Sequence, residues 1–210
     1  MTERASNCPN CGAPIVFRWS GSVQTVCAYC QSILVRTDVD LRKMGQVGDL
    51  PPESSPIQIT TTGIYGKLAF TVNGRIIYEY EQGGWNEWHI VFNDGADAWL
   101  SDAQDEYAIS YLQKNILTPR PFAAPLGKTF EWKNIQFEVT SRTEAHYRGV
   151  EGELPFQYWD KKDVLFIDLR SQASDFATLD YSDEPGSLYI GKAVDFDSLR
   201  LTNVRKFEGW

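Results

Sequence analysis

The sequence has no long apolar run and no apolar leader. Hydrophobic residues make up 42% of the 210 residues, yet no stretch approaches the ~20 consecutive apolar residues that a membrane-spanning helix requires. The N-terminal residues, MTERASNCPN, lack the apolar core of a secretory signal peptide. We therefore expect no membrane insertion and a cytoplasmic location.

The chain is also short of positive charge. It has 20 Lys and Arg against 28 Asp and Glu, for a net charge of −8. Residues 1–43 carry an excess of two positive charges, which leaves −10 on the remainder. Proteins that bind nucleic acid usually present clustered Lys and Arg to the phosphates. This balance disfavours nucleic acid as a partner, and the alternative left open is contact through Arg4, Arg18 and Arg36 of the N-terminal segment.

Recognisable catalytic motifs are missing as well. The chain contains no GxGxxG, GxxxxGK[ST], GxSxG or HExxH pattern. It has two histidines, and its four cysteines all belong to two CxxC pairs, so no thiol remains as a nucleophile. These absences disfavour a hydrolase or a transferase and favour a non-catalytic protein.

The two CxxC pairs are the strongest motif that the sequence does contain. Cys8 and Cys11 are separated from Cys27 and Cys30 by fifteen residues, a spacing typical of a four-cysteine zinc ribbon. Two turns and a hairpin would direct four thiolates at one Zn²⁺ ion. Four sulfurs leave no open coordination position, so we expect a structural zinc ion rather than a catalytic one. A pair of disulfides is the competing interpretation, and it requires an oxidising compartment.

The distribution of turn residues divides the chain into segments. We expect a mostly β protein in which a small zinc ribbon precedes a β-barrel or a curved antiparallel sheet, built as one unit or as two similar halves. The expected segments are a zinc ribbon (1–36), a Pro-containing linker (37–56), a first β unit (57–118), a Pro-rich connection (119–127) and a second β unit (128–210).

Three local patterns bear on the β units. Asn73-Gly74, between KLAFTV and RIIYEY, predicts a tight hairpin turn. GKLAFTVNGRIIYEY and NIQFEVTSRTEAHYRG have a similar order of strand-like segments, which either a duplication or convergent hairpin composition explains. SDAQDEYAISYLQK fits both a helix that begins with a capping box and an alternating strand.

Aromatic and acidic residues supply the candidate partner-binding positions. Trp85 follows two glycines, and we expect it to lie on a loop as an exposed anchor for a protein partner. Trp88, Glu151 and Glu153 are the other candidates for partner binding. Alternation places Trp88 on a core face, and it places Glu87 and His89 as neighbours on the opposite face, with the spacing of an ordinary surface ion pair.

An enzyme remains an alternative to the interaction module. Such a site would bring Glu87, His89, His146 and Glu151 around one cleft, with carboxylates and imidazoles exchanging protons. It requires the two histidines to converge from different halves of the chain.

From Val47 onward the sequence resembles a bacterial family, the domain of unknown function 4178. The resemblance is carried by VGDLPP, YEYEQGGWNEWHIVFNDGADAWLSDAQ, EGELPF and FATLDYSDEPGSLYIGKAVDFDSLRL. It implies a β-rich, non-catalytic domain, commonly preceded by a zinc ribbon, and it supplies no catalytic residues. It also implies the company of membrane-stress proteins and polyamine-synthase-like proteins. Together with the residues above, the resemblance predicts a zinc-containing adaptor for a protein partner.

Overall fold

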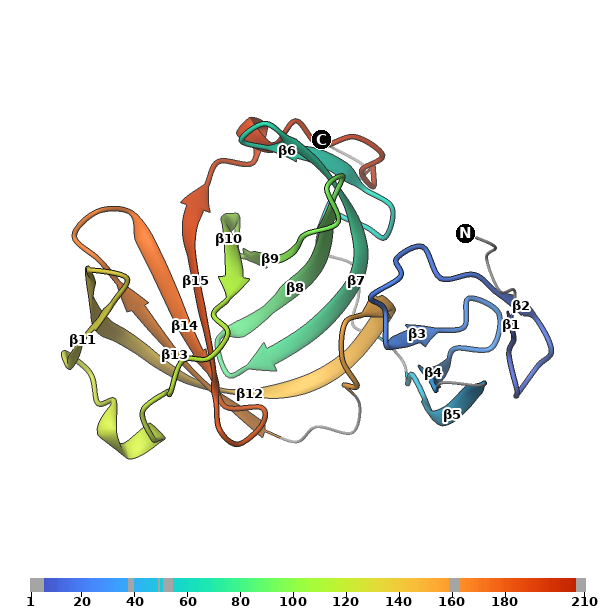
Figure 1. Cartoon of the computed structure of the whole chain (residues 1–210), viewed down its shortest axis with the longest axis horizontal. Helices are drawn as coiled ribbons and strands as arrows, with labels where there is room; N and C mark the ends of the chain where they lie inside the picture. Colours follow the sequence, from blue (N-terminus) through green and yellow to red (C-terminus); the bar gives the residue numbers. More distant parts are fainter. Residues whose placement is uncertain (1–5, 38–39, 49, 51–54, 159–162, 207–210) are drawn as a thin grey trace.

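The computed structural model describes residues 6–37, 40–48, 50, 55–158 and 163–206. The fold is mostly β, as expected, with a small cysteine-rich ribbon beside a large, curved antiparallel sheet (Figure 1). The ribbon contains β1 Ser6–Asn7, β2 Pro14–Ile15, β3 Gln24–Val26, β4 Ser32–Arg36 and β5 Leu41–Gln46. The large sheet contains β6 Thr62–Tyr65, β7 Leu68–Tyr80, β8 Gly83–Phe92, β9 Asp97–Ala103, β10 Glu106–Leu112, β11 Thr129–Trp132, β12 Ile135–Leu154, β13 Asp163–Arg170, β14 Asp175–Asp180 and β15 Ser187–Val194.

The large sheet closes on itself. Within the described residues, eight strands follow the order β12-β13-β14-β15-β10-β9-β8-β7, and β7 pairs again with β12. The first half of β12 pairs with β13, and its second half pairs with β7. Two four-stranded meanders, β7–β10 and β12–β15, are therefore joined first strand to first strand and last strand to last strand. The result is a barrel built from two similarly connected halves.

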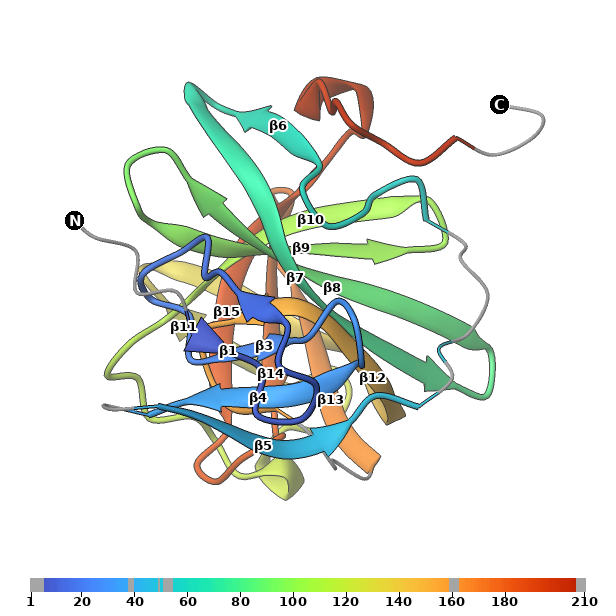
Figure 2. The same ribbon diagram turned by 90° about the vertical axis from the view of Figure 1, so that its right-hand side faces the viewer.

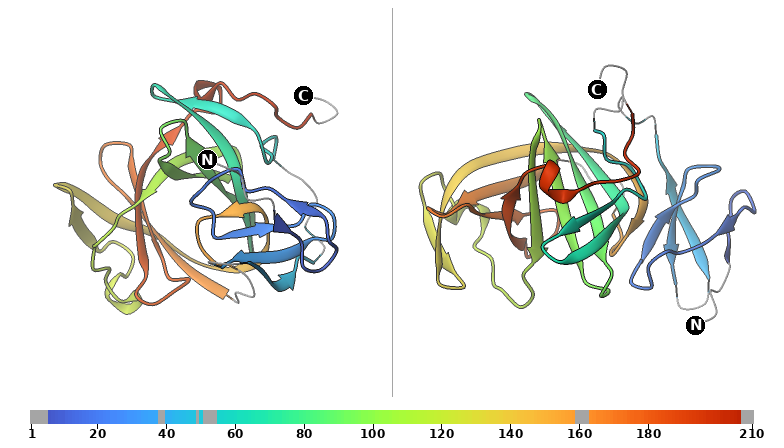
Figure 3. Two further views of the ribbon diagram at one scale, coloured as in Figure 1. Left: turned by 45° about the vertical axis from the view of Figure 1, so that its right-hand side comes forward. Right: turned by 90° about the horizontal axis from the view of Figure 1, so that it is seen from above.

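The ribbon continues from the barrel through a shared strand. The last two residues of β12, Glu153 and Leu154, pair with Thr25 and Gln24 of β3. Figure 1 shows this end of β12 next to β3, and Figure 2 shows β3, β4 and β5 facing the viewer as a separate small sheet. Figure 3 shows the ribbon at one side of the barrel in two further views. β12 is thus common to both parts of the molecule.

The span expected to be a linker, 37–56, contains β5 among its described residues. β5 pairs with β4 at the edge of the ribbon sheet. Only Leu41 of this strand is buried, because one face and one edge of β5 meet solvent. An edge strand of this kind carries no apolar alternation, which explains why the sequence pattern did not indicate it.

The hairpin expected at Asn73-Gly74 is wrong. β7 runs through both residues as one strand of 13 residues, with a bulge between Val72 and Gly74. Gly74 lies opposite Gly152 of β12, and a Cβ on Gly74 would lie 2.1 Å from the carbonyl oxygen of Glu153. The glycine is needed for the close approach of two backbones rather than for a turn.

A tight turn does occur in the segment that fitted both helix and strand. β9 ends at Ala103 and β10 begins at Glu106. Between them, Gln104 and Asp105 have φ angles of 51° and 67°. Two consecutive positive φ angles match the type I′ turns that join neighbouring antiparallel strands. The segment is therefore a β-hairpin.

The outer face of each meander is covered by other parts of the chain. Trp88, Ile90 and Leu100 of the first meander pack under Ile57 and Leu199, which belong to segments before β6 and after β15. The outer face of the second meander packs against Ala124 and the aromatic residues of β11. The 3-10 helices Pro121–Ala123 and Asp197–Leu199 lie in these covering segments. None of the helices in the described part of the chain has the length and apolar character needed to cross a membrane.

Candidate functional sites: the cysteine cluster and the barrel cavity

The four cysteines of the ribbon converge on one point. Their sulfur atoms all lie within 4.8 Å of one another. The Sγ atoms of Cys8 and Cys30 are 3.7 Å apart, and those of Cys11 and Cys27 are 3.8 Å apart. Four sulfurs placed about 2.3 Å from one ion lie about 3.8 Å apart in a tetrahedron, whereas a disulfide requires about 2.05 Å. The described thiols are free and their spacing fits a metal ion.

The two CxxC turns are built alike. In each turn the first cysteine donates its N–H five residues ahead, Cys8 to Ala13 (2.8 Å) and Cys27 to Ser32 (2.9 Å). The residue after the second cysteine adopts a positive φ, 77° for Gly12 and 57° for Gln31. The repeated backbone geometry turns both thiols of a pair toward the same side. One turn uses glycine for the left-handed position and the other does not.

Glu153, one of the candidate partner residues, holds the ribbon against the barrel. Its side chain is 1% exposed. Its carboxylate accepts hydrogen bonds from the backbone N–H groups of Arg18 (2.8 Å) and Trp19 (3.3 Å) and from the hydroxyl of Ser22 (2.5 Å). The residue therefore contacts the ribbon of its own chain, and its burial leaves it no surface for an external partner.

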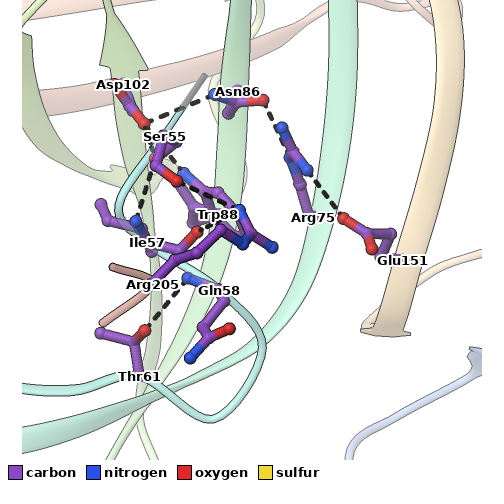
Figure 4. A network of polar contacts seen from close by, with 10 residues as sticks. All are labelled: Ser55, Ile57, Gln58, Thr61, Arg75, Asn86, Trp88, Asp102, Glu151 and Arg205. Atoms are coloured by element: carbon purple, nitrogen blue, oxygen red, sulfur yellow. Dashed lines mark hydrogen bonds and ion pairs between the residues drawn. The ribbon is translucent and has the colours of Figure 1, made fainter. Parts of the chain in front are cut away.

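Glu151 belongs to a different network, drawn in Figure 4. It accepts a hydrogen bond from Arg75 at 2.8 Å, and Arg75 also donates to Asn86 at 2.8 Å and lies over the ring of Trp88. Asn86 then donates to Asp102, which also accepts a hydrogen bond from Ser55. Burial raises the pKa of Asp102, and the surrounding donors oppose that shift. The network fixes the covering segment to the barrel's outer face.

Inside the barrel lies a cavity of about 650 Å³. In antiparallel sheets directly paired residues share a face, and the pairs Glu87–Ser101, Asp168–Thr178 and Thr143–Phe166 all place their side chains at this cavity. A smaller space of about 40 Å³ continues deeper, between the cavity and the aromatic residues near the ribbon. The interior of the barrel is therefore partly polar and partly hollow.

Glu87 occupies the boundary between the two spaces. It lines both, accepting hydrogen bonds from Trp85 Nε1–H (3.0 Å) and from the hydroxyl of Ser101 (2.8 Å). Burial raises the pKa of Glu87 to about 8, and Asp168 and Asp180 add to the shift. No cation pairs with Glu87 among the ion pairs found in the described part of the chain. The donors that contact its carboxyl group are both neutral.

Asp168 is a second inward carboxyl. It accepts hydrogen bonds from the hydroxyls of Thr178 (2.8 Å) and Ser141 (2.9 Å). Burial raises the pKa of Asp168, while the two hydroxyls and the charge of Arg170 lower it. The guanidinium of Arg170 lies at the cavity, 4.8 Å from the ring centroid of Phe176.

Aromatic rings form the wall beside Glu87. The ring of Trp85 stacks on Tyr78 at 5.0 Å and contacts Phe166 at 5.3 Å and Tyr80 at 5.7 Å. Burial raises the pKa of Tyr78 well above its ordinary value, which keeps its phenol protonated and able to donate. The cavity thus combines flat apolar surfaces with oriented polar groups, the composition expected of a small-molecule site.

The structure corrects the expected positions of the two candidate tryptophans. Trp85 lies within β8 and faces the cavity, rather than on an exposed loop. Trp88 is completely buried on the outer face, under the covering segments. Glu87 and His89 do not form the expected ion pair, since His89 pairs with Asp97 at 3.1 Å.

The structure does not bring together the residues of the expected enzyme site. His89 is fully buried between Trp19 of the ribbon and Trp99, whereas His146 has an exposed side chain that contacts Asp163. His146 lies opposite Glu79, which is adjacent to the inward Tyr78 and so points outward, while His89 follows the inward Glu87 by two residues. The two imidazoles are on opposite faces of the sheet. The buried Nδ1 of His89 has no hydrogen-bond partner among the described residues.

The arginines considered for nucleic acid contact are partly engaged within the ribbon. Arg18 lies 3.9 Å from Glu153, and Arg36 lies over the ring of Phe17. Arg4 is outside the described residues. Of the three arginines considered, the two that the structure describes therefore already have contacts within the chain.

Several cavity residues were missed by sequence reasoning, among them Ser101, Asp168, Thr178 and Tyr189. A signal for one of them exists: Asp168 is the one acid within the apolar run VLFIDL. An acid in such a strand points to a polar barrel interior only if the apolar residues on the other face of the strand are covered. That cover comes from segments distant in the sequence, so the strand alone does not show it.

Comparison with known proteins places the barrel in a family. No curated protein and no solved structure matches the chain. The model of the family described as Domain of unknown function (DUF4178) matches residues 58–196, which span the barrel from just before β6 through β15. With most of its length matched, the chain belongs to the DUF4178 family.

Proposed function

We propose that the barrel is a binding domain for a small molecule and that the ribbon is a structural element held by Zn²⁺. The observation that carries the first part is the cavity of about 650 Å³, which lies within the ~300–1,000 Å³ usual for ligand sites. Folding would gain from filling the barrel with apolar side chains, yet the interior keeps polar groups and small residues. Ala108 and Ala193, for example, face each other across β10 and β15 at the cavity.

The proposal is for binding and not for catalysis. The inward groups are carboxyls, hydroxyls and aromatic rings, and the described cavity wall contains no histidine or cysteine. Glu87 and Asp168 are each held by neutral donors. Such groups orient a ligand.

The proposal for Zn²⁺ rests on the donor set. Four thiolates in a tetrahedral arrangement suit Zn²⁺, and a closed shell of four ligands suits a structural role. Free thiols at non-bonding distance also fit a reducing compartment such as the cytoplasm. Zn²⁺ supplies charge and geometry that bring the two CxxC turns together.

A cavity-filling variant tests the binding proposal. Ala108→Trp would occupy the cavity, and ligand-detected NMR would compare it with the wild type using one mixture of neutral, anionic and cationic compounds. Compounds that bind the wild type should lose their signal with the variant. Leu117→Trp, which adds the same ring at a residue that is 89% exposed, is the matched control. A mixture in which no compound distinguishes Ala108→Trp from the wild type contradicts the proposal.

An adaptor for a protein partner is the second candidate function. It is favoured by exposed apolar side chains in the connection between β10 and β11, where Leu117 is 89% exposed and Phe122 is 79% exposed. Large exposed apolar residues that lie close in sequence often mark an interaction surface. Affinity capture from a native extract should lose a specific partner with Leu117→Ser/Phe122→Ser, and should retain it with Tyr29→Ser, an exposed aromatic of the ribbon. Identical captured proteins from both variants would remove this candidate.

A further inference from the structure

The charges around the cavity are strongly one-sided. Its described wall carries five carboxyl groups and one guanidinium: Glu87, Asp105, Glu106, Asp168 and Asp195 against Arg170. Glu87 and Asp168 lie inside, whereas Asp105, Glu106 and Asp195 are exposed at the rim. A charged ligand entering this cavity passes acidic groups at the rim and meets further acidic groups inside.

The single basic group of the described wall lowers the pKa of Asp168, but it forms no ion pair with Glu87 among the described residues. Arg170 is exposed, and its guanidinium lies over Phe176. Glu87 receives its two hydrogen bonds from a tryptophan N–H and a serine hydroxyl. A carboxylate withdrawn from water and held by neutral donors is stabilised by any cation placed beside it.

The aromatic residues provide the second part of a cation site. Trp85, Tyr80, Phe166 and Phe176 line the same cavity as the carboxyls. The faces of such rings attract cations and also pack against apolar groups. An organic ammonium ion would use both properties, because its charge meets the carboxyls and its carbon skeleton meets the rings.

We propose that the barrel cavity binds an organic cation, an amine carried on an apolar chain. The inference rests on the proposed binding function and adds the chemical class of the ligand. An anionic ligand would meet like charges at the rim and would oppose ionisation of the carboxyls inside, and a neutral ligand would gain only the contacts with the rings. The carboxyls at two depths also suit a molecule with an ammonium group at each end.

The test compares three probes with the same eight-carbon chain and different end groups. The full-length, metal-loaded protein is labelled with 5-fluorotryptophan, and the Trp85 resonance is identified with Trp85→Phe. The protein is then titrated with 1,8-diaminooctane, 1,8-octanediol and suberate. The Trp85 resonance should shift with the diamine, and the diamine should bind at least about tenfold more tightly than the diol, with suberate weaker still.

Two cavity variants and one surface variant identify the groups responsible. Glu87→Gln and Asp168→Asn should each weaken diamine binding about tenfold and leave diol binding unchanged. Glu79→Gln removes one negative charge on the outer face, where Glu79 pairs with Arg148, and should leave diamine binding unchanged. If a cavity variant fails to fold, the ranking of the three probes on the wild type still decides the ligand class.

Each other outcome overturns the inference. Equal or tighter binding of the diol or of suberate at Trp85 rejects a cation as the ligand, while it leaves the proposed binding function intact. A Trp85 resonance that none of the probes shifts rejects this ligand class as well, and the broader compound mixture then decides the binding function separately. Diamine binding that falls equally in Glu79→Gln shows nonspecific attraction to an acidic protein.

Discussion

The ribbon and the barrel keep their shapes by different means. Among its described residues, the ribbon has a small core cluster of five buried residues, two of which are cysteines of the four-cysteine cluster. The barrel is held by a closed ring of strands, by apolar clusters on its outer faces and by a cluster in one part of its interior, and it leaves the rest of the interior partly empty. The ribbon packs around four cysteines that could hold a metal ion, whereas the barrel packs on its outer faces and in one part of its interior. The difference separates a part whose cysteines could hold a metal ion from a part whose interior has room for a ligand.

Removal of the metal gives the largest expected difference between the two parts. Binding of a structural zinc ion contributes on the order of 10 kcal/mol to the folding of a small domain. A chelator should therefore unfold the ribbon and leave the barrel folded. Hydrogen exchange measured by mass spectrometry should show rapid exchange in β3 and β4 and continued protection in β7 and β8. Cys8→Ser should reproduce the result without chelator, and protection of the ribbon in the metal-free protein would contradict it.

Substitution of Glu153 tests the contact between the ribbon and the barrel. Glu153→Ala leaves two backbone N–H groups and a buried hydroxyl without their acceptor. We expect a loss of about 3 kcal/mol in the free energy of unfolding, because hydrogen bonds to a buried charged group are strong and their partners remain buried. Urea denaturation measures the loss. Glu79→Ala, which removes a partly exposed ion pair with Arg148, should cost less than about 1 kcal/mol. Equal losses in the free energy of unfolding for the two variants would mean that the buried hydrogen bonds of Glu153 stabilise the protein no more than an exposed ion pair does.

The interior of the barrel should make its stability depend on pH. Burial raises the pKa of Glu87 to about 8, so between the ordinary glutamate pKa and that value the folded state binds more protons than the unfolded state. The stability contributed by protonated Glu87 is present at low pH and is lost as the pH rises through about 8. Asp168 on β13, Asp180 on β14, Tyr78 on β7 and Tyr189 on β15 surround the same space.

Glu87→Gln isolates this effect. The wild type should lose about 2 kcal/mol relative to the variant between pH 5 and pH 9, a value reduced from the full linkage because the side chain meets solvent through the cavity. Thermal unfolding at a series of pH values supplies the measurement. Parallel stability curves for the two proteins would show that Glu87 does not titrate in this range.

The smallest expected effect distinguishes the two CxxC turns within the ribbon. Gln31 adopts a positive φ that costs a residue with a Cβ about 1 kcal/mol, whereas Gly12 adopts the corresponding angle freely. Gln31→Gly should therefore raise the stability of the metal-loaded ribbon by up to about 1 kcal/mol, and Gly12→Ala should lower it by a similar amount. Competition with a coloured chelator would measure both changes as metal affinity. Changes of the same sign would contradict the interpretation.

The sequence predicted those features that depend on residues close together along the chain. The cysteine spacing indicated a cluster, and the sulfur atoms do converge. The alternation of apolar residues and the turn residues indicated a β protein, which the structure confirms. The resemblance to the DUF4178 family is also confirmed.

The features that sequence reasoning missed depend on distant parts of the chain. Asn73-Gly74 has the composition of a turn, but the approach of β12 keeps it within a strand. Alternation separated the two faces of β8 correctly, yet it could not show that Ile57 and Leu199 cover one face while the barrel encloses the other. The cavity follows from that arrangement, so no single segment indicated it.

Strand β12 also constrains how this protein can change. Its 20 residues pair in succession with β13, β7 and β3, so one strand sets the register of both meanders and of the ribbon. Loss or gain of one residue in the middle of β12 would exchange the sides of every residue beyond it. Insertions and deletions are therefore best tolerated in the loops. A change in the length of β12 would alter strand pairing in the ribbon and in the barrel together.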